Sequence, residues 1–124
     1  MRINFPDNFF SGIIGDTWLH QESAITNPDD LINYDDMSKM LDITSIWTPD
    51  KIFLMNQTNE IPSSEYFDPH PSGAFAILNT QKLMNFIRSG CSVVLNDVTH
   101  LNPKIKSVAS FLEEMTGAQV QANI

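Results

Sequence analysis

The sequence predicts a single α+β unit, and three observations lead to that prediction. The chain has 124 residues, of which 42% are hydrophobic, so it can form one folded domain. Its first half is irregular and rich in aromatic residues. Its second half runs helix, strand, helix, strand, an order that alone could also form a parallel α/β unit. Because the first half is irregular, we favour α+β, with an irregular region over 1–76 and a regular one over 77–124.

The first half offers weak but definable elements. Apolar residues three to four apart predict a short helix over 9–18, and residues 23–26 predict a short strand. A turn at 27–30 leads into a helix over 34–41, and residues 51–55 predict another strand. Residues 60–73 contain three prolines, so we expect an exposed loop there.

The second half carries clearer boundary signals. Asn79 predicts a helix start and Gly90 its end, and residues 92–95 predict a strand. Asn102 and Pro103 predict the start of a last helix, which Gly117 ends. A strand is then predicted from Val120 to Ile124. The expected buried face of the last helix comprises Ile105, Val108, Ala109, Leu112 and Met115.

Charge and composition exclude several classes of function. The net charge is −8 and the seven basic residues are scattered, so we expect no direct nucleic-acid binding. The longest apolar run is far below the roughly 20 residues of a membrane span. No signal-peptide pattern begins the chain, and its single cysteine, Cys91, excludes an internal disulfide. These features predict a cytoplasmic protein without a membrane partner.

Few residues suggest chemistry of their own. The three histidines are isolated in sequence, whereas zinc sites use clustered ligands. Asp68 and His70 are close in sequence but lie in the proline-rich segment, so surface roles are favoured over metal binding. Asp97 and His100 follow a predicted strand and could contact a ligand or simply form a turn. We therefore expect no catalytic residue and no metal ligand set in this chain.

Two further features have plain structural interpretations. Asp35 and Asp36 stand near the start of a predicted helix, where the helix dipole favours acidic side chains. Cys91 precedes an apolar strand, which favours a buried, unreactive thiol over a nucleophile because no neighbouring base is evident.

The second half resembles a segment of the cupin-like Jumonji C family, in particular its ribosomal-oxygenase-like members. The resemblance rests on the runs at 90–98 and 117–123, which flank Asn102-Pro103 and the last predicted helix. In the family, a glycine, an apolar strand and an asparagine precede a helix, and a strand with an Asn-x-Tyr motif follows. Residues 9–26 and 29–41 resemble the family's opening elements more loosely.

The resemblance implies a function that this chain does not complete. Family members use Fe(II), 2-oxoglutarate and O₂ to hydroxylate protein side chains or demethylate lysine, on a double-stranded β-helix (jelly-roll) domain. Their iron ligands, a His-x-Asp/Glu pair and a distal histidine, follow the Asn-x-Tyr strand. Asn123 matches the motif's asparagine and is implied as a wall residue of the 2-oxoglutarate pocket, although it could instead satisfy neighbouring backbone. No ligand motif follows it, so the barrel is incomplete and no cofactor is expected in this chain alone.

Three functional hypotheses follow. The first is the N-terminal fragment of such a protein hydroxylase, truncated before its iron ligands, with the missing C-terminal half as its partner. The second is a non-catalytic interaction module that dimerises through the strand edge from Val120 to Ile124. The third is an unrelated small enzyme built on Asp68, His70 or His100. Whether the chain is an enzyme is left open by its sequence.

Overall fold

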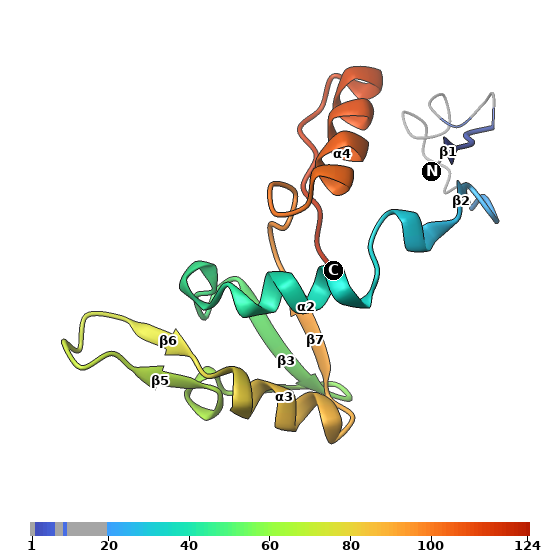
Figure 1. Cartoon of the computed structure of the whole chain (residues 1–124). Coiled ribbons are helices and arrows are strands. Elements are labelled where there is room, and N and C mark those ends of the chain that lie inside the picture. Colours follow the sequence, from blue (N-terminus) through green and yellow to red (C-terminus); the bar gives the residue numbers. More distant parts are fainter. Residues whose placement is uncertain (1, 7–8, 10–19) are drawn as a thin grey trace.

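The computed structural model describes residues 2–6, 9 and 20–124 and has a mixed α+β architecture (Figure 1). Its strands form three small sheets in which every pairing is antiparallel. No closed barrel is formed by these residues. The α+β prediction is therefore confirmed, and the parallel α/β alternative is excluded for the described part of the chain.

The central sheet has the strand order β4-β3-β7, with bounds Asn59–Ile61, Ile52–Asn56 and Ser92–Leu95. In its register Ile52 lies opposite Leu95. Alternate β3 side chains, Ile52 and Leu54, are fully buried, which is the period-two pattern of a strand with one face on the core. The predicted strand over 51–55 is thus confirmed, and the turn after it carries Gln57 at φ +56°.

The C-terminal residues extend this sheet beyond β7. Leu95 and Ile124 exchange two backbone hydrogen bonds, of 2.6 and 2.9 Å, and the Val98 N–H donates to the Ala122 carbonyl at 3.0 Å. Two residues, Asn96 and Asp97, therefore stand opposite the single residue Asn123, which is a β-bulge. The end of the C-terminal segment therefore runs antiparallel to the end of β7. It does not form the regular strand predicted from Val120 to Ile124, because only Ala122 and Ile124 make backbone pairs with the segment that begins at Leu95.

A second sheet is the hairpin of β5 (Phe67–Pro69) and β6 (Ala76–Leu78), which projects from the body (Figure 1). It overturns the prediction of an exposed loop over 60–73. That segment contains β4, a 3₁₀ turn at Ser63–Glu65 and β5, and its Tyr66 and Phe67 belong to the core. The prediction was wrong because Pro62 and Pro69 stand at the ends of elements. Proline has no backbone N–H to donate, and at the end of an element this does not interrupt the hydrogen bonds of a sheet.

Helices α2 (Tyr34–Asp42) and α3 (Thr80–Arg88) pack against the core of the central sheet. Helix α4 (Pro103–Thr116) stands beyond the end of β7 and joins the core through Ile105 (Figure 1). The Asn79 side chain caps α3 by accepting the Lys82 N–H at 3.0 Å. Gly90 follows at φ +95° and Gly117 ends α4 at φ +67°, a backbone region that favours glycine. The predicted boundaries of these helices are confirmed.

The third sheet pairs β1 (Arg2–Ile3) with β2 (Ile25–Thr26), which confirms the short strand predicted near residue 25. The Asn4 N–H adds a hydrogen bond of 2.7 Å to the Ala24 carbonyl. The helix predicted over 9–18 falls outside the described residues except at Phe9. Phe5 lies against Phe9, with ring centroids 4.3 Å apart, and stacks on Phe111 of α4 at 6.1 Å.

The core lies where the central sheet meets α2, α3 and the start of α4. Within it, the side chain of Trp47 is 2% exposed, and its Nε1–H donates to the Met40 carbonyl at 2.9 Å. From α4 only Ile105 and Ala109 are buried, whereas Met115 is 50% exposed, so the predicted apolar face is wrong at that end. The other buried hydrophobic residues are Met40, Leu41, Ile52, Leu54, Tyr66, Phe67, Leu78, Leu83, Leu95 and Val98.

Candidate functional site

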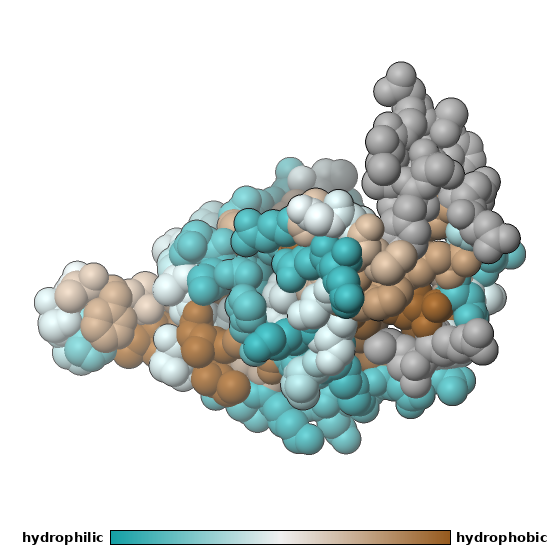
Figure 2. Space-filling view, turned by 90° about the horizontal axis from the view of Figure 1, so that it is seen from above, coloured by the Kyte–Doolittle hydropathy of each residue, from teal (hydrophilic) through white to brown (hydrophobic). Residues whose placement is uncertain are grey.

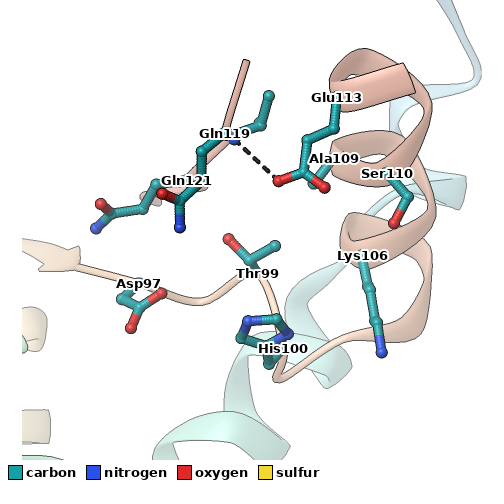
Figure 3. A pocket seen from close by; sticks show the side chains of 10 residues that line it. Asp97, Thr99, His100, Lys106, Ala109, Ser110, Glu113, Gln119 and Gln121 are labelled. Atoms are coloured by element: carbon teal, nitrogen blue, oxygen red, sulfur yellow. Dashed lines mark hydrogen bonds between the residues drawn. The ribbon is translucent and has the colours of Figure 1, made fainter. Parts of the chain in front are cut away.

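A polar hollow of about 500 Å³ lies between α4, the loop that follows β7 and the C-terminal segment (Figure 3). Two of the residues named from the sequence, Asp97 and His100, line it together. The structure therefore brings these two side chains to one place, with others that are distant in sequence. The remaining lining residues are Thr99, Lys106, Ala109, Ser110, Glu113, Gln119, Val120 and Gln121.

The bulge after β7 shapes one wall of the hollow. Asp97 has a left-handed backbone, with φ +56°, which aspartate tolerates better than most residues. Its N–H donates to Asn123 Oδ1 at 3.0 Å, and Thr99 Oγ1 accepts the Ala122 N–H at 2.9 Å. Thr99 is only 6% exposed, so its hydroxyl supplies the hydrogen-bond partner that the Ala122 N–H would otherwise need from water.

Helix α4 forms the opposite wall. Asn102 begins the helix by accepting N–H groups of Lys104 and Ile105, at 2.8 and 3.3 Å. Near the other end of α4, Glu113 Oε1 accepts the Val120 N–H at 3.0 Å. This carboxylate joins the helix to the C-terminal segment and holds the hollow open between them.

Three charged or titratable groups of the hollow make no hydrogen bond or ion pair with the residues that the structure describes. They are the Asp97 carboxylate, the His100 imidazole and the Lys106 ammonium. The hollow thus combines charges of both signs and suits a polar solute better than an apolar one. No described hydrogen bond joins His100 to Ser110 or to Asp97, so a nucleophile-and-base pair is not assembled here.

Sequence reasoning missed the α4 wall of the hollow. Lys106, Ser110 and Glu113 follow one another at intervals of four and three residues, so they share one face of the helix. That spacing is a usable signal. The sequence does not show that this helix face lies opposite Asp97 and His100, because that arrangement depends on how α4 packs relative to the end of β7.

Asn123, which the resemblance implies as a cosubstrate contact, lies at the edge of this region. Its side-chain oxygen accepts the Asp97 N–H and, at 3.3 Å, a proton of the Gln121 side-chain amide. The side chain is exposed and holds the bulge in its geometry. Asn123 thus hydrogen-bonds to neighbouring backbone, which is the alternative to a cosubstrate contact that its sequence position left open.

Asp68 and His70 do not converge on a common site. The Asp68 carboxylate accepts hydrogen bonds from Lys82 Nζ at 2.5 Å and from Asn79 Nδ2 at 2.6 Å. The hydrogen bond from Lys82, and then that from Asn79, holds the pKa of Asp68 below its ordinary value of 3.8. His70 turns to its own loop, with Nδ1 2.7 Å from Ser72 Oγ.

The ring of His70 stacks on Phe75, with centroids 4.2 Å apart. Beside this pair a second hollow, of about 410 Å³, extends along β6 towards Trp47. Phe75 and Ile77 are 58% and 38% exposed, and Figure 2 shows hydrophobic groups along the projecting hairpin. His70 therefore belongs to an apolar surface and not to a ligand cluster.

Other residues considered from the sequence have structural roles. Asp36 forms a capping box with Asn33, which accepts the Asp36 N–H at 2.9 Å and donates its own N–H to the Asp36 carboxylate at 3.3 Å. Asp35 shares that first helical turn. Cys91 is half-buried and not buried as predicted, because it precedes β7 and does not lie within it; its Sγ is 3.7 Å from Ser89 Oγ.

A metal centre is not formed by the part of the chain that the structure describes. Within residues 2–6, 9 and 20–124 no three His, Cys, Asp or Glu side chains gather closely enough to hold a metal ion. The described residues therefore do not fit the Fe(II) ligand set that the family resemblance implies. No step of an iron-dependent reaction can be derived from them.

Comparison with models of protein families, with curated proteins and with solved structures finds no match for this chain. No helix among the described residues has both the length and the apolar character needed to cross a membrane.

Proposed function

We propose that this chain is the N-terminal region of a cupin-like Jumonji C Fe(II)/2-oxoglutarate-dependent protein hydroxylase, without complete catalytic machinery of its own. One observation carries the proposal. The ends of the two runs that bear the resemblance, 90–98 and 117–123, lie side by side and antiparallel: the Val98 N–H donates to the Ala122 carbonyl, and the Asp97 N–H donates to the Asn123 side chain. Because a jelly-roll barrel is built from antiparallel strands, this pairing is compatible with the start of such a barrel.

The open side of the C-terminal segment supports the same proposal. Val120, Ala122 and Ile124 direct their N–H groups inward, to Glu113, Thr99 and Leu95. The alternate residues Gln119, Gln121 and Asn123 therefore present their backbone outward, and no described group pairs with it. A barrel strand could add to this edge, supplied by a continuing chain or by a second polypeptide.

In this proposal the chain shapes the oxygenase and does not perform its oxidation. The iron ligands and the basic residue for the far carboxylate of 2-oxoglutarate belong to the barrel. Asn123 would stand in the wall of the cosubstrate pocket, with its orientation fixed by the Asp97 N–H. A protein substrate and a cytoplasmic location are parts of the same proposal.

The test compares the 124-residue chain with the product of any longer reading frame. Isothermal titration with Mn(II), a redox-inert stand-in for Fe(II), and with 2-oxoglutarate should give no stoichiometric binding to the 124-residue chain. A longer product that contains tyrosine after Ile124 and then a His-x-Asp/Glu motif should bind both. Tight metal binding by the short chain, or a longer frame that lacks the motif, would contradict the proposal.

A non-catalytic interaction module is the second candidate, and the same outward-facing edge favours it. The two candidates differ in what covers the edge. An oxygenase region needs barrel strands that bring iron ligands, whereas an interaction module needs only a strand from a partner. A longer product that pairs with a partner strand and binds no metal would favour the module.

A further inference from the structure

The polar hollow beside α4 has the size and the lining of a site for a small molecule. Its volume of about 500 Å³ lies within the roughly 300–1,000 Å³ of ligand pockets. Three separate segments, 97–100, 106–113 and 119–121, supply its walls, so it exists only in the folded chain (Figure 3). Two of its lining residues, Thr99 and Ala109, are held firmly by the fold, since they are 6% and 3% exposed.

Hydrogen-bond donors of the hollow gather near the start of α4. His100 lies three residues before the helix and Lys106 is its fourth residue, and Figure 3 shows both at this end of the hollow. Ser110 follows one turn later on the same face of the helix. Neither the imidazole nor the ammonium has a hydrogen-bond or ion-pair partner in the described part of the chain. These groups can therefore bind one anionic group, with Lys106 supplying the opposite charge.

A carboxylate stands across the hollow from these donors (Figure 3). Asp97 has its backbone fixed by the bond from its N–H to Asn123 Oδ1, at 3.0 Å, while its carboxylate has no partner among the described residues. The second carboxylate of the lining, Glu113, is already engaged, because its Oε1 accepts the Val120 N–H at 3.0 Å. Asp97 is therefore the group available to bind a positive charge.

We propose that the hollow binds a small zwitterion, a molecule that carries both an ammonium and a carboxylate, such as a free amino acid. Lys106, with His100 and Ser110, holds the carboxylate, and Asp97 holds the ammonium. A ligand with a single charge would leave either Asp97 or Lys106 without a counter-charge, and a simple anion would also be repelled by the chain's net charge of −8. The inference rests on the hollow itself and does not depend on the assignment to an oxygenase.

The test titrates the 124-residue chain with unbranched ω-amino acids, from glycine to aminohexanoate, and follows its backbone amide signals by NMR. These probes carry the same two charges and differ only in the distance between them. We expect saturable shifts of the Thr99 and Val120 amide signals, with the highest affinity at one chain length, because Asp97 and Lys106 project from opposite walls of the hollow. Alkyl carboxylates and alkylamines of that same length, with one charge each, should bind more weakly.

Two variants assign the charges. Asp97→Asn and Lys106→Gln each remove one, and each should weaken binding of the best probe roughly threefold to fivefold, the effect of one exposed ion pair. Asparagine tolerates the left-handed backbone of position 97, so the bulge is kept. Glu114→Gln and Lys39→Gln make the same changes at exposed positions outside the hollow and should leave the affinity unchanged. The absence of saturable shifts, equal affinity for the singly charged analogues, or full affinity in either Asp97→Asn or Lys106→Gln would overturn the proposal.

Discussion

Replacing Tyr66 with phenylalanine removes one oxygen atom from the centre of the core. Tyr66 is fully buried, and its hydroxyl donates to the Ile52 carbonyl at 3.3 Å. Burial raises the pKa of this hydroxyl, so it stays protonated, and able to donate, across the neutral range. In the Tyr66→Phe variant the rings keep their packing, but the buried Ile52 carbonyl loses its partner.

The magnitude follows from the geometry of that bond. An unsatisfied buried acceptor costs about 1–3 kcal/mol. At 3.3 Å the bond is longer than the roughly 2.8 Å of an ideal O–H···O bond, so the lower part of that range applies. We expect Tyr66→Phe to lower the free energy of unfolding by about 1–2 kcal/mol. The melting temperature should fall by roughly 4–8 °C.

Urea unfolding followed by circular dichroism measures this change, and the chain supplies its own control. Its other tyrosine, Tyr34, is 77% exposed, so Tyr34→Phe should change the free energy of unfolding by less than about 0.5 kcal/mol. Equal unfolding midpoints for Tyr66→Phe and Tyr34→Phe would refute the placement of the Tyr66 hydroxyl. The same result would contradict the burial of Tyr66 in the core.

Three further predictions concern the surface and the bulge. Asn33→Ala breaks the capping box of α2 and should lower the free energy of unfolding by about 1 kcal/mol in urea titrations; an unchanged midpoint would contradict it. Because the folded pKa of Asp68 is depressed, its contribution is present above its unfolded pKa and is lost as the pH falls through the lower folded value. An NMR titration should find its pKa below 3.8, and Lys82→Met should raise it; no change would argue against the ion pair. Asn123→Ala removes the acceptor of the Asp97 N–H and should speed hydrogen exchange at that amide, whereas unchanged exchange would show that the bulge holds without it.

What the sequence predicts well is set by local chemistry. Asn79 and Gly90 bound α3 correctly, because caps depend on residues within one helical turn. The strand over 51–55 follows from its own apolar run. Asp97 and His100 were named as possible contacts because they follow a strand end, and both line the hollow.

What the sequence does not predict depends on contacts between distant segments. β4 and β5 have three residues each and gain their stability from partners, so no pattern in 60–73 identifies them. Tyr66 is buried because α3 and β3 close over it. Met115 was predicted as buried from helical spacing alone, which cannot tell that α4 extends past the core at that end.

The order of pairing in the central sheet also has a consequence for how the chain folds. β7 lies between β3 and the C-terminal segment, and both of these neighbours are distant from it in sequence. The entropy of closing such long loops must be overcome before any of these pairings becomes favourable, which slows folding. The helices can form earlier from local contacts. We therefore expect the newly made chain to expose the apolar flank of β7 until Ala122 and Ile124 dock beside it, the interval in which it is most prone to aggregate.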